Sequence, residues 1–130
     1  MNYVDWIDKA KNDLLAAEAI IAYYEEPPTD TVLYHCHQVV EKCLKAFLIA
    51  KLQKLDMIHD LPKLLEDCLL IDKEFESYSY QMENLNAFFI DSKYPPDPPT
   101  LFSLDEAKEG LKQAKDLFYF VSKKLDIASK

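Results

Sequence analysis

The chain has 130 residues, and its 23 acidic and 15 basic side chains give a formal net charge of -8 at neutral pH. With 49% hydrophobic residues, a chain of this length can build a core without disulfides or metal ions, so we expect one domain over residues 1–130. It holds a single glycine, against about nine expected from average usage. That scarcity disfavours hairpin-rich β folds and glycine-rich phosphate loops.

The basic residues are all lysines. Excess negative charge repels polyanions, so charge alone disfavours non-specific nucleic-acid binding. Without arginine, a phosphate site in this chain has to use lysine or backbone amides. Residues 1–5 lack the features of a secretory signal, and no apolar stretch is long enough for a bilayer, so we expect a cytoplasmic protein.

The three cysteines, Cys36, Cys43 and Cys68, show no metal-binding or disulfide-framework spacing. We expect them to be small buried hydrophobic residues, and we expect no metal and no cofactor.

Two long helices are predicted in the first half of the chain. Residues 5–24 carry apolar side chains at helical spacing, and two prolines end this segment. Thr29 or Asp30 is expected to cap a second helix that runs to about residue 53. Its broad apolar stripe predicts a central helix and consists of Cys36, Val39, Val40, Cys43, Leu44, Phe47 and Ala50.

Three further helices follow. Asp60 and Pro62 predict the start of a short one, a fourth helix is expected over residues 73–91, and the proline-rich stretch 92–102 is expected to be a loop. Ser103 and Glu106 form a capping-box pattern before the fifth, in which Gly110 costs stability unless another backbone approaches closely. The predicted fold class is all-α, an antiparallel up-and-down helical bundle of four long helices plus one short helix.

The densest polar cluster lies on the second helix, where His37, Glu41 and Lys45 form a row at i, i+4 spacing, with Gln38 and Tyr34 beside it. This row could bind a small molecule or a base, with His37 titrating near neutral pH and Lys45 contacting a phosphate. Alternatively, it is a salt-bridged row that faces solvent or a partner subunit. His35 lies about 200° from His37 around the helix, so the two cannot share a metal ion.

Other polar residues have competing interpretations. Asp13 lies at the edge of a buried stripe and needs a partner, for which Lys42, Lys45 or a hydroxyl is suitable. His59 beside Asp60 is either a polarised imidazole or a residue that fixes a turn. The remaining pair, Lys93 and Tyr94 in the predicted loop, would serve either a docking surface or the local structure.

Taken in order, these motifs resemble those of the HEPN family, the higher eukaryotes and prokaryotes nucleotide-binding domains. Trp6, Ala10, Asp13, Leu14 and Ala17 resemble its W-x3-A-x2-D-L-x2-A opening. The segment from Gln38 to Ala46 resembles Q-x-x-E-K-x-x-K-A, and residues 59–61 match H-D-L. The stretch 85–95 resembles L-x4-I-x-x-R-Y-P, with Lys93 at the arginine position.

This resemblance implies an up-and-down bundle of four or five helices that often dimerises, beside a small nucleotidyltransferase in toxin–antitoxin or defence modules. Many relatives are ribonucleases with an Arg-x4-6-His motif near the last helix. Here there is no arginine, and no histidine follows His59. The electrostatic clamp and the acid–base group of that reaction are therefore missing, and we assign no catalytic residue.

Three functions remain open. The first is a homodimeric module that binds a nucleotide or a nucleotidyltransferase partner, with ligand-binding candidates His37, Gln38, Glu41, Lys45, His59, Asp60, Lys93 and Tyr94. The second is a divergent ribonuclease using His37 or His59, and the third is a purely structural oligomerisation unit. The candidate dimer seam is an apolar stripe at Leu48, Ile49 and Tyr34, or at Phe88 and Tyr119.

Overall fold

The computed structural model describes residues 2–54, 60–93 and 101–127, with the backbone alone over residues 88–93. Within these ranges the chain forms helices and no strand, which confirms the all-α prediction. The elements are α1 (Tyr3–Tyr23), α2 (Thr29–Leu52), α3 (Leu61–Ile71), the 3-10 helix η1 (Lys73–Tyr78), α4 (Ser79–Lys93) and α5 (Leu104–Lys124).

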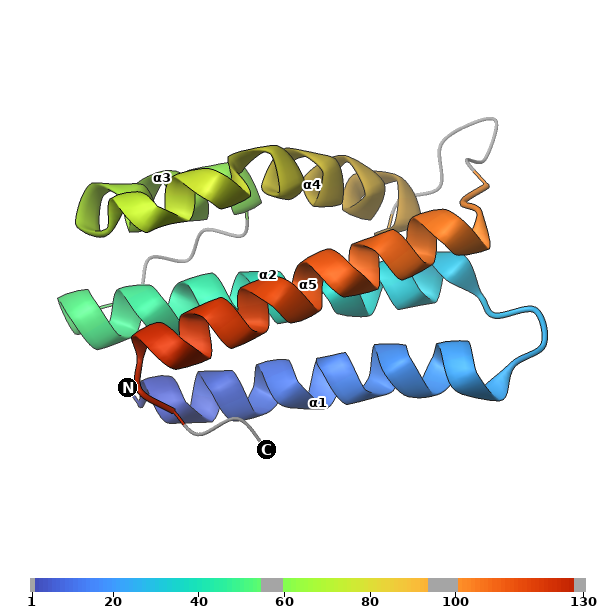
Figure 1. Cartoon of the computed structure of the whole chain (residues 1–130), viewed down its shortest axis with the longest axis horizontal. Helices are drawn as coiled ribbons and strands as arrows, with labels where there is room; N and C mark the ends of the chain where they lie inside the picture. Colours follow the sequence, from blue (N-terminus) through green and yellow to red (C-terminus); the bar gives the residue numbers. More distant parts are fainter. Residues whose placement is uncertain (1, 55–59, 94–100, 128–130) are drawn as a thin grey trace.

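The helices form four antiparallel arms (Figure 1). α1 runs alongside α2, and η1 and α4 together form a third arm on the other side of α2, with the short α3 lying beside η1 and running in the opposite direction. α5 then returns across α2 and reaches α1. The up-and-down bundle of four long helices and one short helix is therefore confirmed, with α3 as the short one.

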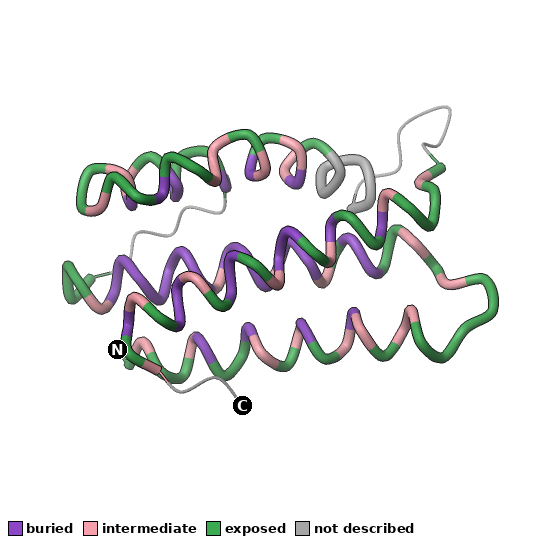
Figure 2. Tube along the Cα trace, in the orientation of Figure 1, coloured by how far each residue is buried: buried purple, intermediate pink, exposed green. Residues whose placement is uncertain are grey.

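α2 is the central helix, as its broad apolar stripe predicted. It packs against α1, α3, α4 and α5, and it is buried along most of its length (Figure 2). Six residues of the predicted stripe are buried, namely Cys36, Val39, Val40, Cys43, Leu44 and Phe47. The 24 residues of α2 thus supply surface to every other arm of the bundle.

The capping residues predicted for α2 and α5 agree with the structure in one of the two helices. The predicted capping box of α5 is present, because the Ser103 amide donates to Glu106 Oε1 and the Glu106 amide donates to Ser103 Oγ, each over 3.0 Å. The predicted cap of α2 is wrong, since Pro28 occupies that position. Thr29 is already helical, and its hydroxyl donates to the Phe102 carbonyl over 2.8 Å, which joins α2 to the segment before α5.

The fourth predicted helix differs from the observed one at both ends. It begins as η1, in which Phe75 is fully buried between the rings of Phe47 and Phe120, with centroid distances of 4.7 and 5.0 Å. These aromatic contacts accompany a 3-10 turn where helical periodicity alone predicted α-helix. At the other end, α4 includes Lys93 although the loop was expected from residue 92. A proline restricts the residue directly before it, so Lys93 can stay helical.

The three cysteines are free and buried, as predicted. Burial raises the pKa of the Cys36 thiol to about 12, and burial also raises the pKa values of Cys43 and Cys68. These thiols are therefore protonated at neutral pH and act as packing groups. Among the described residues, no set of three metal-ligating side chains converges and no helix combines the length and apolar character needed to cross a bilayer.

Gly110 of α5 was expected to cost stability unless another backbone approached closely, and in the structure it lies against side chains. A Cβ atom at this position would stand 2.5 Å from Leu33 Cδ2 and 3.6 Å from Leu85 Cδ2. Leu33 is itself buried on α2. The glycine therefore lets α5 approach α2 closely.

Gly110→Ala is expected to lower the free energy of unfolding by about 1 kcal/mol, because overpacking against Leu33 outweighs the gain in helix propensity. In a Leu33→Ala background, where that space is empty, the same change should be stabilising. Urea denaturation of the four proteins measures both effects. Equal stabilisation in both backgrounds would show that the close approach has no energetic consequence.

Candidate functional site

The predicted polar row on α2 lies inside the bundle. His37 is 0% exposed, Glu41 7% and Lys45 2%. The alternative in which this row faces solvent is therefore wrong, because α2 is covered by the other arms. Lys45 Nζ lies 3.3 Å from Glu41 Oε2, so the charged members of the row pair with each other. Gln38, beside the row, is partly buried.

The buried ammonium group also contacts α1. Lys45 Nζ lies 5.7 Å from the centre of the Trp6 ring, a cation–π geometry. Trp6 therefore packs near the Glu41–Lys45 pair from the start of α1. Since all three members of the row are buried, a ligand could reach them only through movement of the surrounding helices.

Asp13 of α1 has two partners on α2. Its carboxylate oxygens lie 2.5 Å from Lys42 Nζ and 2.9 Å from His35 Nδ1, and all three side chains are partly exposed. Lys42 was one of the predicted partners, whereas His35 was not considered for this role. The signal was present in the sequence, because residues 35 and 42 are seven apart and so share the face of α2 opposite His37.

A small cavity of about 150 Å³ adjoins this part of the α1–α2 seam. It is lined by Asp5, Trp6, Lys9 and Lys42. We call it the Trp6 pocket. It combines an indole ring with the ammonium groups of Lys9 and Lys42 and the carboxylate of Asp5, and Lys42 also pairs with Asp13.

The other predicted site residues are not brought together within the described structure. His59 and Tyr94 lie outside the described residues, as does the side chain of Lys93, whose backbone ends α4. Asp60 is the predicted N-cap of α3 and makes no side-chain capping bond.

Burial also decides which residues of the predicted dimer seam are available for an interface. Leu48 and Ile49 are buried within the bundle, so they are not a leftover apolar stripe. Tyr34 and Tyr119 are each 38% exposed, and the Phe88 side chain lies outside the described part of the chain. The two tyrosines therefore remain candidates for an interface.

Lys45→Met is expected to destabilise the bundle by roughly 3 kcal/mol or more, because it leaves Glu41 as a buried charge without this partner. The double variant Glu41→Gln/Lys45→Met should lose less than the sum of the single losses. Lys63→Met is the control, since Lys63 forms an exposed i, i+4 pair with Asp67 at 3.2 Å. That change should cost about 1 kcal/mol or less. Equal losses for Lys45 and Lys63 in urea denaturation would contradict the burial argument.

A larger cavity, of about 500 Å³, lies between η1 with the start of α4 and the C-terminal half of α5. We call it the η1–α5 groove. It was missed by sequence reasoning, because its residues come from two segments more than 30 positions apart and share no motif. Its lining residues are Ser77, Tyr78, Gln81, Asp116, Tyr119, Phe120 and Lys123.

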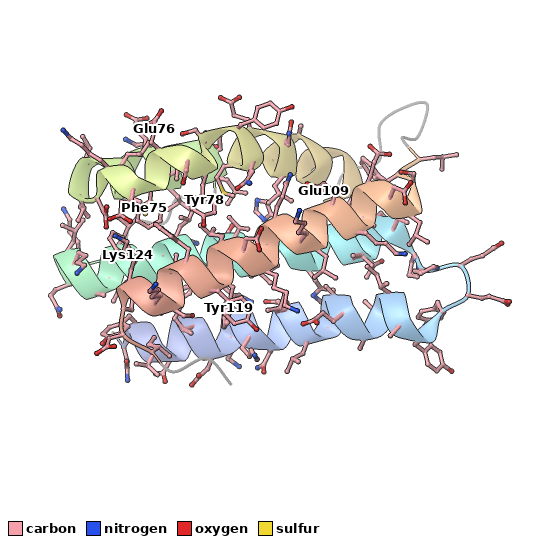
Figure 3. All side chains as sticks on the ribbon, in the orientation of Figure 1. Phe75, Glu76, Tyr78, Glu109, Tyr119 and Lys124 are labelled. Atoms are coloured by element: carbon pink, nitrogen blue, oxygen red, sulfur yellow. The ribbon has the colours of Figure 1, made fainter. Side chains whose placement is uncertain are left out.

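Aromatic rings join the two sides of this groove. Phe120 packs against Phe75 and Tyr78, with centroid distances of 5.0 and 4.8 Å, and Figure 3 shows Phe75 and Tyr78 on the side of η1 that faces α5. Burial, followed by the nearby Asp116 carboxylate, raises the pKa of the Tyr78 phenol. Tyr78 therefore keeps its proton at neutral pH and can donate a hydrogen bond.

An ion-pair cluster holds the same two segments together. Lys124 Nζ lies 2.9 Å from Asp72 Oδ2 and 2.9 Å from Glu74 Oε1. The Glu74 amide and Lys124 lower the pKa of the Asp72 carboxyl, and the two carboxylates raise the pKa of Lys124. Asp72 and Lys124 therefore both carry charge at neutral pH, and η1 is attached to the end of α5 by charge as well as by aromatic packing.

Gln81 and Asp116 place oxygen acceptors in the groove. Gln81 Oε1 is buried and has no hydrogen-bond partner among the described groups, and Gln113 Oε1 is in the same state. Gln113 Nε2 donates to Glu109 Oε1 over 3.3 Å, while Asp116 presents an exposed carboxylate in the groove. Gln113 lies about two turns before Phe120 on α5 and is not one of the residues that line the groove.

The model of the HEPN domain family matches residues 3–125, almost the whole chain. The chain belongs to the HEPN family. The crystal structure of TT1696 from Thermus thermophilus has a similar fold, with a TM-score of 0.80 over 95% of this chain and 99% of that chain, at 24% sequence identity. No curated protein sequence gives a significant match.

The HEPN assignment confirms the resemblance drawn from the ordered motifs. The motif residues are now placed physically: Trp6 packs beside Lys45, Asp13 pairs with Lys42, and the Gln38–Ala46 segment forms the buried middle of α2. Much of the HEPN pattern in this chain therefore consists of contacts between α1 and α2.

Proposed function

We propose that this HEPN chain is a recognition module that binds a partner protein and does not cleave RNA. The observation that supports this most directly is the η1–α5 groove, an accessible surface lined by three aromatic rings and several polar groups. The two histidines of α2 are poorly placed for an acid–base mechanism. His37 is fully buried, and His35 is engaged by Asp13. A general acid or base has to reach the proton that it transfers.

The same proposal includes the assembly that the family resemblance implies. The chain acts in the cytoplasm as a homodimer and works with a small nucleotidyltransferase in a toxin–antitoxin or defence module. The partly exposed Tyr34 and Tyr119 support an interface through their rings, since aromatic side chains are enriched in protein interfaces. The net charge of -8 supports a protein partner over a polyanionic one.

The purified chain is expected to leave single-stranded and structured RNA intact. His37→Ala and His59→Ala variants, incubated beside the wild type, test the ribonuclease alternative, and electrophoresis of the RNA is the measurement. Val40→Ala is the matched control for His37→Ala, because it also truncates a fully buried residue of α2. Cleavage that one histidine variant abolishes and Val40→Ala retains would establish an enzyme.

Affinity purification of the tagged chain from its native host completes this test. A stoichiometric protein that co-purifies with it supports the recognition module. Purification of the chain alone, with no nucleotide-dependent shift of its melting temperature, would instead support the purely structural oligomerisation unit.

The Trp6 pocket favours a second candidate function, the binding of a nucleotide. Its indole ring suits a base and its lysines suit phosphate, which has to be bound by lysine or backbone amides in a chain without arginine.

If this candidate is correct, ATP at a hundred times its Kd stabilises the folded chain by about 2.7 kcal/mol and raises its melting temperature. Lys9→Gln should reduce that shift, whereas Lys108→Gln on the exposed surface of α5 should retain it. The measurement is thermal unfolding with and without ATP. An unchanged melting temperature at millimolar ATP would contradict nucleotide binding at this pocket.

A further inference from the structure

We propose that the η1–α5 groove binds the guanidinium group of an arginine side chain presented by a partner protein. The inference rests on the proposed function, because it assumes that the chain recognises another protein, and it names the chemistry of that partner. It follows from the kinds of polar atoms in the groove, from its aromatic lining and from the composition of the chain.

One buried amide oxygen at the groove calls for a hydrogen-bond donor. Gln81 Oε1 has no hydrogen bond within the described part of the chain, although buried polar atoms in proteins are normally satisfied. Gln81 lines the groove directly, and the Asp116 carboxylate adds two further acceptor oxygens. A ligand that satisfies these groups has to carry several donors, preferably with a positive charge.

The aromatic lining selects among cationic donors. Tyr78, Tyr119 and Phe120 all line the groove. A guanidinium group is flat, carries five N–H donors and stacks on aromatic faces, whereas an ammonium group is compact and strongly hydrated. Arginine therefore fits the combination of rings and acceptors better than lysine does.

The composition of the chain indicates where this arginine comes from. The sequence contains no arginine, so a second copy of the chain cannot supply the group. A net charge of -8 attracts a basic partner at long range. The occupant is accordingly an exposed arginine on a protein of different sequence.

The charge of Lys123 makes it possible to test whether the ligand of the groove is a cation or an anion. It is an exposed cation at the rim of the groove, so it opposes a guanidinium ligand and would favour a phosphate-bearing ligand. Removing its charge should strengthen arginine binding and weaken anion binding.

The experiment is an NMR titration of the full-length, isotope-labelled chain with the peptide acetyl-Gly-Arg-Gly-amide. The matching lysine and citrulline peptides serve as ligand controls, since lysine keeps the charge and citrulline keeps the shape without it. We expect shifts of the Gln81 side-chain amide and of backbone amides around Asp116 and Phe120. Arginine should bind about tenfold more tightly than lysine, and citrulline should not bind measurably.

Variants of the exposed groove residues complete the design. Asp116→Asn should weaken arginine binding by about tenfold, and Lys123→Gln should strengthen it by about threefold. Lys115→Gln is the control, because Lys115 lies on the side of α5 that faces α1 and pairs with Glu18 at 3.4 Å. It should leave the affinity unchanged. The spectrum of each free variant verifies that it is folded.

Absence of binding by the arginine peptide, equal binding of the lysine peptide, or weaker binding on Lys123→Gln would overturn the proposal. These results differ from failure of the proposed function. If the groove does not bind arginine but the chain still captures a partner protein, recognition stands and only the chemistry assigned to this groove is wrong. RNA cleavage that depends on a histidine would overturn recognition whatever the peptide does.

Discussion

The packing of α2 against the four other α-helices is the constraint on which the rest of the bundle depends. A helix covered by α1, α3, α4 and α5 has little surface left for solvent. Its apolar residues supply the core, and its charged residues have to be paired where they lie. Lys45 meets this requirement through Glu41 and the Trp6 ring, and Lys42 through Asp13. Because Lys45 contacts the Trp6 ring and Lys42 pairs with Asp13, these two residues of α2 fix the position of α1.

The polar chemistry of the bundle is divided between two places. The α1–α2 seam holds the charged groups that the motif pattern emphasises, and most of these groups are partnered within the chain. The η1–α5 groove holds groups outside the motifs, namely three aromatic rings, an exposed carboxylate and the buried amide oxygen of Gln81. The first arrangement stabilises the fold, whereas the second presents binding capacity to the surroundings. This division is why recognition is assigned to the groove although the motifs lie elsewhere.

The 3-10 helix η1 contributes residues both to the core and to the groove. In the 3-10 helix η1, residues three apart lie on the same face, so Phe75 and Tyr78 both contact Phe120, Phe75 within the core and Tyr78 at the groove. The Asp72–Lys124–Glu74 cluster holds the same elements from the surface. The groove is therefore built on segments fixed by both aromatic packing and charge, and such rigid support favours a defined ligand geometry.

The sequence by itself determined the fold class, the central place of α2, the capping box of α5 and the burial of the cysteines, because each follows from local spacing or composition. It also included Lys42 among the candidate partners of Asp13, together with Lys45 and a hydroxyl. Tertiary structure decided the rest. Whether His37, Glu41 and Lys45 face solvent depends on which helices cover α2, and periodicity along one helix does not contain that information. The groove joins residues 77–81 to residues 116–123, so it exists only after α5 has folded back against η1.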